Sequence, residues 1–295
     1  MQILSSDETV NEQAVVNYYF EKVASYWAEV YERDNDLHAL IYQERLQILL
    51  ELVGKIALPR QARVMEVGCG AGYATVALAR LGYFIDAIDA TRVMVDSTRN
   101  RAINSGLQSR VRSSLGDVRE LPFPDETFGL VVAMGVLSWL PSMAKAMQEM
   151  CRVLQPEGYL ILGVENRWGL RQFLDPFENP LLGPVKELAR RVLRPSEREV
   201  PRVRSRSSSI RAYDAMLDAH HLEKLEGVTF GFGPLTLFGW ELLPHPMGLK
   251  VHRGLQALAH RSIPVVRSIG ALYTVLGRKS GSASLGTEKA ASVKY

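Results

Sequence analysis

Short apolar runs and amphipathic stretches alternate along the chain from residue 63 onward. The apolar runs have the length of strands, and the stretches between them repeat their apolar positions with the spacing of helices. The predicted strands are residues 63–67, 84–88, 111–115, 128–134, 159–164, 222–230 and 272–276. The predicted helices among them are residues 73–81, 92–105, 142–154, 210–219 and 249–260. This alternation predicts an α/β protein with a doubly wound, mostly parallel sheet.

The pattern differs at both ends of this core. Residues 1–10 are polar and are expected to be loose, whereas residues 11–31 and 37–56 read as two helices. After residue 165 the alternation stops, and residues 166–209 read as an insertion with a short helix at 184–193 and an Arg-, Pro- and Ser-rich stretch. The expected organisation is a helical cap or lid at 1–58, a core at 59–165, the insertion at 166–209, a return to the sheet at 210–278 and a disordered tail at 279–295.

Composition narrows the class of protein. The net charge of +3 over 295 residues gives no reason to expect nucleic-acid binding. Two distant cysteines form neither a disulfide framework nor part of a cluster with metal-ligand spacing, so we expect no metal site. The sequence starts without a secretory signal and has no apolar stretch long enough for a bilayer, and a cytoplasmic protein is therefore expected.

A glycine-rich turn carries the strongest chemical signal. The strand at 63–67 leads into Gly68, Gly70 and Gly72, and a helix follows directly. Glycines allow a tight turn and close contact between backbone and ligand, and the helix start offers free N–H groups. Many nucleotide sites share these features, and the glycines alone could also be mere turn chemistry. Two further details narrow the choice.

Glu66 lies at the tip of the first strand, immediately before this turn. A carboxylate beside a pyrophosphate would be repelled, and a dinucleotide fingerprint would have glycine where Tyr73 stands. S-adenosylmethionine has an ammonium group, a sulfonium group and no phosphate. The residues therefore favour this cofactor, with Glu66 near its amino-acid end.

Acidic residues follow the next two strands. Asp89 ends the second strand at a spacing that suits hydrogen bonds from both ribose hydroxyls of an adenosine. Asp117 could accept from the adenine amino group, with the backbone N–H of Val118 near a ring nitrogen, although Asp117 could instead cap a helix. Met134 ends the fourth strand, where the chain enters a loop expected to lie under the cofactor.

These pieces, in this order, resemble the class I (Rossmann-like) S-adenosylmethionine-dependent methyltransferases. The stretches LPFPDETFGLVV at 121–132 and CRVLQPEGYL at 151–160 look like the subgroup with ubiquinone/menaquinone C-methyltransferases and methyltransferase type 11 domains. The resemblance covers roughly residues 15–165 and implies a seven-stranded sheet of order 3-2-1-4-5-7-6 with strand 7 antiparallel. It also implies Gly68, Gly70 and Gly72 under the cofactor, Asp89 on the ribose and Asp117 near adenine. Glu66 stands where an Asp is commoner.

The acceptor side is less specific. Glu165 at the end of the fifth strand and His245 between two prolines are weak candidates for a catalytic role. The aromatic run in residues 18–27 is either helix packing or part of a lid over the cofactor. The aromatic and aliphatic residues in 230–240 suggest a small, lipophilic acceptor methylated on oxygen or carbon.

Three alternatives stay open. A Rossmann oxidoreductase that uses NAD(P) is disfavoured by Glu66 and the glycine spacing, and a non-catalytic S-adenosylmethionine-binding partner protein would share the whole cofactor site. A nucleic-acid methyltransferase would have an Asn/Asp-Pro-Pro-Tyr/Phe motif where Met134 and the next residues stand. The basic segment 186–211 is either a solvated loop or a peripheral contact with an anionic membrane.

Overall fold

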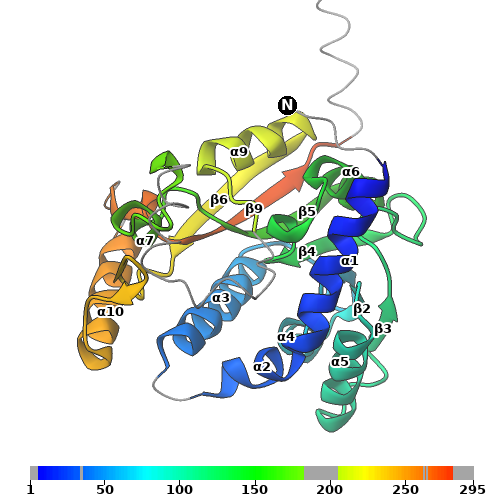
Figure 1. Ribbon diagram of the computed structural model, residues 1–295. Coiled ribbons are helices and arrows are strands. Elements are labelled where there is room, and N and C mark those ends of the chain that lie inside the picture. The colour runs from blue at the N-terminus through cyan, green and yellow to red at the C-terminus, as the bar shows by residue number, and fades with distance from the viewer. Residues whose placement is uncertain (1–5, 34–35, 183–204, 262, 264, 282–295) are drawn as a thin grey trace, which may run out of the picture.

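The computed structural model describes residues 6–33, 36–182, 205–261, 263 and 265–281 of the chain. A seven-stranded sheet runs through the centre of the molecule, with helices on both faces (Figure 1). The strands are β1 (Arg63–Val67), β2 (Phe84–Asp89), β3 (Val111–Leu115), β4 (Phe128–Met134), β5 (Leu154–Glu165), β6 (Leu222–Phe230) and β9 (Leu272–Lys279).

The strand order is β3-β2-β1-β4-β5-β9-β6. Strands β1 to β5 pair in parallel, and β9 lies antiparallel between β5 and β6. The seventh expected strand is β9, so the predicted order 3-2-1-4-5-7-6 with an antiparallel strand 7 is confirmed. This arrangement places the carboxyl ends of β1, β2, β4 and β5 at one edge, where open α/β sheets bind ligands.

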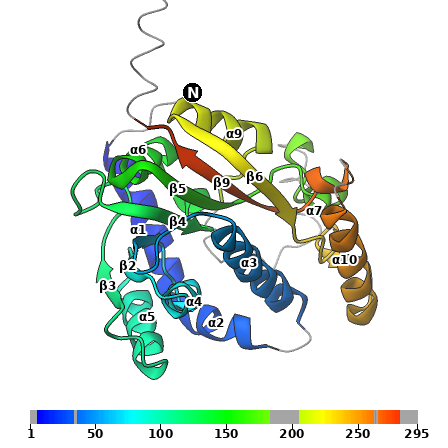
Figure 2. The same ribbon diagram turned by 180° about the vertical axis from the view of Figure 1, so that it is seen from behind.

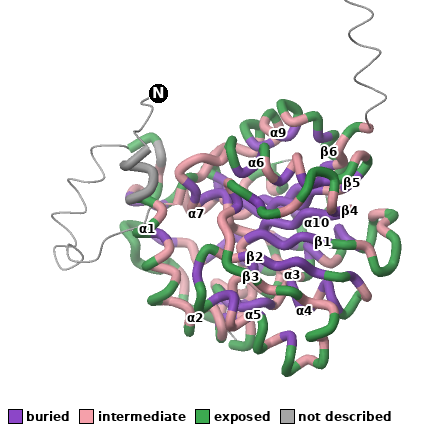
Figure 3. The backbone as a smooth tube through the Cα atoms, turned by 90° about the vertical axis from the view of Figure 1, so that its right-hand side faces the viewer, coloured by how far each residue is buried: buried purple, intermediate pink, exposed green. Residues whose placement is uncertain are grey.

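Two apolar cores lie on opposite faces of the sheet. Along β4, Val131 and Ala133 join one core, whereas Leu130 and Val132 join the other. Helices α6 (Met143–Val153) and α9 (Ile210–Ala219) cover the first face, while α3 (Leu37–Gly54) and α4 (Tyr73–Arg80) cover the second (Figure 2). The buried central strands and the exposed outer helix surfaces are visible in Figure 3. Strand β4 is thus covered on both faces, as its apolar run predicts.

The N-terminal cap differs from the prediction, in which residues 1–10 are loose and residues 11–31 form one helix. Helix α1 (Ser6–Lys22) begins earlier, and the chain breaks at Val23 before α2 (Ala24–Glu29) and the 3₁₀ turn η1 (Val30–Glu32). The break redirects α2 and η1 toward α3 and α5 (Arg92–Asn104), against which they pack. The helical spacing of apolar residues predicts helical structure in this region but does not indicate the bend at Val23.

Residues 155–158, which lie between the predicted helix at 142–154 and the predicted strand at 159–164, are part of strand β5 and form a turn within it. Leu154 already pairs with Phe128, and the ladder resumes at Leu130 with Tyr159, so the turn residues form a bulge opposite Gly129. Glu157 has a φ of 62°, which accommodates the extra residues. The turn chemistry is present, but pairing on both sides makes it a bulge in a longer strand.

The C-terminal half contains elements beyond those expected. These are α7 (Leu170–Leu174), the turn η3 (Pro180–Leu182), the hairpin β7 (Thr236–Leu237) with β8 (Trp240–Glu241), α10 (His245–His260) and the turn η5 (Val266–Ser268). The helix predicted at 184–193, most of the basic segment and the tail beyond residue 281 lie outside the described residues. Lys279 ends β9, where its ammonium group donates to the carbonyl oxygens of Cys151 and Leu154, so the tail cannot begin there.

Within the described ranges, no helix is both long and apolar enough to cross a bilayer. The same part of the chain has no group of three or more His, Cys, Asp or Glu side chains placed to hold a metal ion.

Candidate functional site

The glycine turn between β1 and α4 is fixed by neighbouring elements. The Cys69 N–H donates to the Ile88 carbonyl oxygen at 3.0 Å, which joins the turn to β2. From α5, the Thr98 hydroxyl donates to the Gly70 carbonyl oxygen at 2.9 Å, and the Arg101 guanidinium donates to the Ala71 carbonyl oxygen at 2.8 Å. The turn is therefore held in one shape at the carboxyl edge of the sheet.

Each glycine of the turn meets a different environment. A Cβ on Gly68 would lie 2.3 Å from the Val136 side chain, and one on Gly72 would lie 2.8 Å from the Cα of Thr98. A Cβ on Gly70 would meet nothing within 4 Å and would project into open space. Gly68 and Gly70 line the cavity described below, whereas Gly72, at the start of α4, does not. Gly72 thus serves helix packing, and Gly70 keeps a ligand surface clear.

Glu66 is a buried carboxyl group at the end of β1. The Thr75 hydroxyl of α4 donates a short hydrogen bond to it. Burial raises the pKa of Glu66 to about 8 despite this hydrogen bond, and the nearby Asp89 carboxylate acts in the same direction. A bound cation would relieve this cost, which is the property expected of a site for an ammonium group.

Asp89, at the end of β2, is oriented by three hydrogen bonds. The backbone N–H groups of Gly70 and Thr91 donate to its two oxygens at 3.0 Å each, and the Thr91 hydroxyl donates at 2.9 Å. Burial raises the pKa of Asp89 above its ordinary value in spite of these donors. A carboxylate has further lone pairs, so the oriented group can still accept from ligand hydroxyls.

The other predicted cofactor residues line the same cavity. Asp117 follows β3, and its carboxylate pairs with the Arg119 guanidinium at 2.6 Å. Burial would raise the pKa of Asp117, but the hydrogen bonds from Arg119 outweigh it and hold the pKa below its ordinary value. Val118 is buried in the first apolar core, and Met134 at the end of β4 packs beside Gly163.

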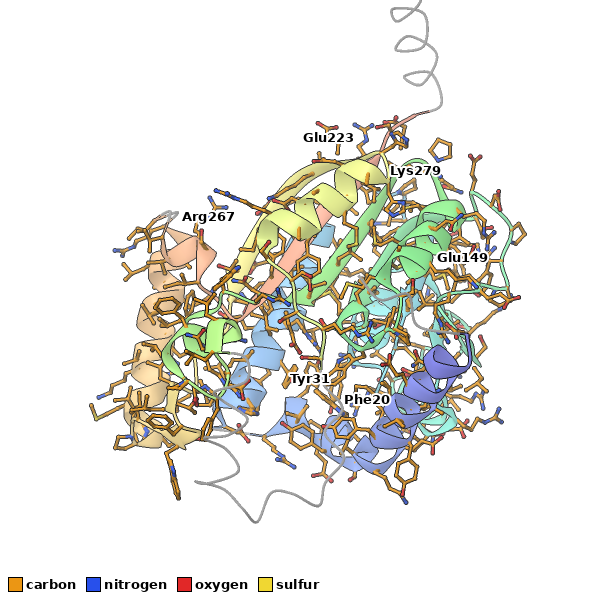
Figure 4. The ribbon with its side chains drawn as sticks, turned by 45° about the horizontal axis from the view of Figure 1, so that its top comes forward. Phe20, Tyr31, Glu149, Glu223, Arg267 and Lys279 are labelled. Carbon is orange, nitrogen blue, oxygen red and sulfur yellow. The ribbon has the colours of Figure 1, made fainter. Side chains whose placement is uncertain are left out.

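A single cavity of about 820 Å³ joins these residues to the N-terminal helices. The cavity is also lined by aromatic side chains, including Tyr19, Phe20, Trp27, Tyr31, Tyr42 and Trp139. The rings form edge-to-face pairs, with centroids 5.2 Å apart for Phe20 and Trp139 and 5.0 Å apart for Trp27 and Tyr42. Phe20 of α1 and Tyr31 of η1, both labelled in Figure 4, are two of these rings. We call the part of the cavity that these rings line the aromatic chamber.

Arg45 is a cavity residue that has no signal in the sequence. It lies on α3, where its guanidinium donates to the Tyr31 hydroxyl at 2.6 Å and lies 4.8 Å from the centre of the Tyr42 ring. Among the described side chains, no carboxylate comes within ion-pair distance of it. The sequence shows only one more arginine on a helix, and the packing of α3 against the sheet turns this one inward.

The two catalytic candidates lie in different places. Glu165 lines the main cavity together with Arg171 of α7, and the Ser205 hydroxyl donates to the Glu165 carboxyl group. Burial raises the pKa of Glu165, while this hydrogen bond opposes the shift. His245 is the exposed first residue of α10, beside a separate pocket of about 460 Å³, and does not line the main cavity.

Comparison with known proteins agrees with this geometry. The family model of the methyltransferase domain matches residues 65–162. Methyltransferase GfsG of Streptomyces halstedii is 34% identical over 101 residues, which cover 34% of this chain and 36% of that protein. A ubiquinone biosynthesis O-methyltransferase of Xanthomonas euvesicatoria pv. vesicatoria (strain 85-10) is 32% identical over 152 residues, covering 50% of this chain and 59% of that protein. The chain thus spans about half the length of the curated relatives it matches.

Among solved structures, the [4+2]-cyclase SpnF has a TM-score of 0.53 at 21% identity, over 80% of this chain and 81% of that one. This likeness concerns the fold alone. Residues 65–162 thus match a methyltransferase domain, and the sheet around them has the strand order that the resemblance to the class I S-adenosylmethionine-dependent methyltransferases implies.

Proposed function

We propose that this protein transfers the methyl group of S-adenosylmethionine to an oxygen or carbon atom of a small, lipophilic acceptor. One observation carries the proposal: the acid-lined glycine turn and the aromatic chamber line one cavity. Its volume of about 820 Å³ lies toward the upper end of the range for ligand pockets, roughly 300–1,000 Å³. A cofactor and a small acceptor can therefore lie side by side in it.

The cofactor end fits the charges of S-adenosylmethionine. Glu66 would accept from the ammonium group, and Arg45, which has no acidic partner among the described residues, would pair with the carboxylate. Asp89 would accept from the ribose hydroxyls, while Asp117 and the backbone at Val118 would contact the adenine. The open space at Gly70 is the surface against which the cofactor would lie.

The bound sulfonium supplies a methyl group that is already activated for displacement. The protein then has to align the acceptor atom with the methyl group and exclude water. The aromatic chamber offers flat apolar walls for these tasks, and its aromatic rings favour a lipophilic acceptor over a highly charged one.

Glu165 is the base that we assign for a hydroxyl acceptor or an acidic carbon. Its raised pKa makes it a better proton acceptor than an exposed carboxylate would be, and it lines the acceptor end of the cavity. His245 lies outside this cavity and is left without a role in the transfer.

A non-catalytic role is the second candidate. The [4+2]-cyclase SpnF has a similar fold, so the fold by itself does not imply methyl transfer. A non-catalytic protein of this fold would bind the cofactor but transfer no methyl group. An NAD(P) oxidoreductase is disfavoured because its pyrophosphate would lie beside the buried Glu66 carboxyl group.

A labelling experiment separates these functions. The full chain is incubated with S-adenosylmethionine that carries a trideuterated methyl group, together with a metabolite extract from cells that lack the gene. Mass spectrometry should reveal an apolar product with the added labelled methyl group, and Glu165→Gln should reduce the yield while cofactor binding is retained. Tight cofactor binding without any labelled product would favour the non-catalytic role.

A further inference from the structure

Helix α10 buries two polar side chains and exposes two large apolar ones. Its polar residues His252 and Gln256 are 1% and 6% exposed, while Met247 and Leu258 are 52% and 36% exposed. The His252 ring accepts from the Phe232 N–H at 3.1 Å and lies 3.4 Å from the Glu44 carboxylate of α3. A helix on the surface of a water-soluble protein normally places its apolar residues inward. Leu249, Leu255 and Ala259 of α10 lie inward in this way, so Met247 and Leu258 are additional apolar side chains on the outer side of the helix.

The outward residues of α10 recur every three to four positions, which places them on one side of the helix. We call this set the α10 stripe, and it consists of Met247, Val251, Gly254 and Leu258. Lys250 and Arg253 border the stripe, and Arg261 follows the helix; all three are exposed. No acidic residue occurs between 245 and 261. The outward side of α10 is thus apolar and flanked by positive charge alone.

Neighbouring segments extend the apolar surface. The hairpin carries Trp240, which is 71% exposed, and the segment that includes α7 carries the exposed Phe173. Asp175 joins the two segments, because its carboxylate accepts from the Gly239 N–H at 2.8 Å. Helices α7 and α10 and the short strands between them lie together at one end of the molecule, away from α5 (Figure 1). Arg267, labelled in Figure 4, lies at this same end.

This end of the molecule also borders the cavity. The pocket of about 460 Å³ lies between the start of α10, the hairpin region and the start of α3. Tyr26 and His38 line both this pocket and the main cavity. The two pockets therefore share a wall at this end of the molecule.

We propose that the α10 stripe and its neighbouring hairpin dock on the surface of an anionic lipid bilayer. A bilayer interface accepts apolar side chains at shallow depth and attracts the bordering Lys250, Arg253 and Arg261 through its negative charge. An acidic protein partner would match the charges, but exposed apolar side chains spread over α7, the hairpin and α10 suit the broad, shallow interface of a bilayer better. Insofar as the shared pocket delivers a lipophilic acceptor from the bilayer, the inference rests on the proposed function; the docking itself does not.

Co-sedimentation of the full chain with vesicles tests the docking. The probes are phosphatidylcholine vesicles with and without phosphatidylglycerol, at low and high salt. The chain should bind the anionic vesicles, bind the neutral ones weakly, and dissociate as salt rises. The double substitution Met247→Ser and Leu258→Ser should weaken binding about tenfold or more. The control, Val93→Ser with Ile103→Ser, removes two exposed apolar side chains of α5 and should leave binding unchanged.

Binding of S-adenosylhomocysteine by each variant serves as the check on folding and is expected to be unchanged. Absence of binding to anionic vesicles by the original chain would overturn the proposal, as would equal losses in the α5 control. Sedimentation that shows a dimer broken by the α10 substitutions would overturn it too and would assign the stripe to a second copy of the chain. None of these outcomes depends on methyl transfer.

Discussion

The Glu66 carboxyl group is buried in the free protein without a cation at ion-pair distance among the described residues. Burial of this carboxyl group is unfavourable for its ionised form and raises its pKa to about 8. Such shifts are common in functional sites, and Glu66 lies where the resemblance to methyltransferases places the cofactor. The carboxyl group is therefore prepared for an ammonium ion, which would restore its charge.

This burial predicts a specific dependence of stability on pH. The pKa of Glu66 rises from 4.5 to about 8 on folding, so the stabilisation from protonated Glu66 is complete below pH 4.5 and is lost as pH rises to about 8. Glu66→Gln removes the titration. The stability of the variant relative to the original chain should increase across this interval by several kcal/mol. Urea unfolding at a series of pH values measures the difference, and a constant difference would contradict the buried carboxyl group.

The glycines of the turn should respond differently to the same substitution. Gly72→Ala places a Cβ against the backbone of Thr98 at a positive φ and should cost roughly 2 kcal/mol or more of unfolding free energy. Gly70→Ala meets no protein atom, so it should cost only about 1 kcal/mol of strain while weakening cofactor binding. Thermal unfolding and calorimetry measure the two effects, and equal effects of both substitutions would contradict the assignment.

Sequence reasoning reached part of this site for a clear reason. Glu66, Gly70 and Asp89 lie at or next to strand ends, and adjacent parallel strands bring their carboxyl ends together whatever the details of packing. Arg45 and Thr75 lie on helices, and their contacts depend on how α3 and α4 rotate against the sheet. The glycine spacing also places Gly72 under the cofactor, but it does not reveal the nearness of Thr98, which is a second reason for a glycine there.

At the scale of elements, the N-terminal cap is joined to the core by a few polar contacts. The Tyr73 hydroxyl contacts the Ala28 carbonyl oxygen and the Glu32 carboxylate at 2.7 Å each. Arg101 of α5 donates to the same two groups at 3.1 Å each, and its guanidinium lies 3.6 Å from the centre of the Tyr73 ring. These contacts join α2 and η1 to α4 and α5 at the edge of the cavity.

Tyr73→Phe tests whether this junction holds the cap closed. The ring and its packing remain, but the two contacts of the hydroxyl are lost, at a cost of roughly 1–2 kcal/mol. S-adenosylhomocysteine should dissociate several times faster, as stopped-flow fluorescence can measure. Tyr83→Phe, which removes a tyrosine hydroxyl from a position outside the cavity lining, is the matched control. An unchanged dissociation rate in Tyr73→Phe would show that the cap is held by its apolar contacts instead.

Strands β1 to β4 and β6 could be predicted almost to the residue, whereas the start of β5, the end of β9, the short hairpin and the shape of the cap could not. A strand such as β4 is specified by its own apolar run, because both faces are buried. The bulge at 155–158 arises from pairing with β4, and the bend at Val23 arises from packing against α3 and α5. Such features depend on partners that are distant in sequence.

At the scale of the whole molecule, the cavity exists only because cap and core lie together. Gln13, Val16 and Trp27 from the cap share it with Glu66 and Asp89 from the core. A ligand that fills the cavity should therefore stabilise both parts in one step.

Hydrogen exchange should show this coupling directly. Saturating S-adenosylhomocysteine should slow amide exchange both in residues 13–31 and in residues 66–72. Exchange should change little in α9, which does not line the cavity. At about 100 times its dissociation constant, the ligand should raise the unfolding free energy by about 2.7 kcal/mol. Protection confined to the core residues would contradict a cavity shared with the cap.

Titration calorimetry of S-adenosylmethionine into the full chain would show whether this cavity binds the methyl donor. We expect one binding site per chain. Glu66→Gln should reduce the affinity about tenfold or more, because a charge-assisted hydrogen bond to the ammonium group is lost. The control Asp96→Asn changes an exposed carboxylate of α5 to an amide in the same way and should leave the affinity unchanged. Absence of binding by the unaltered chain, or equal affinity in Glu66→Gln, would contradict the assignment of this cavity to the methyl donor.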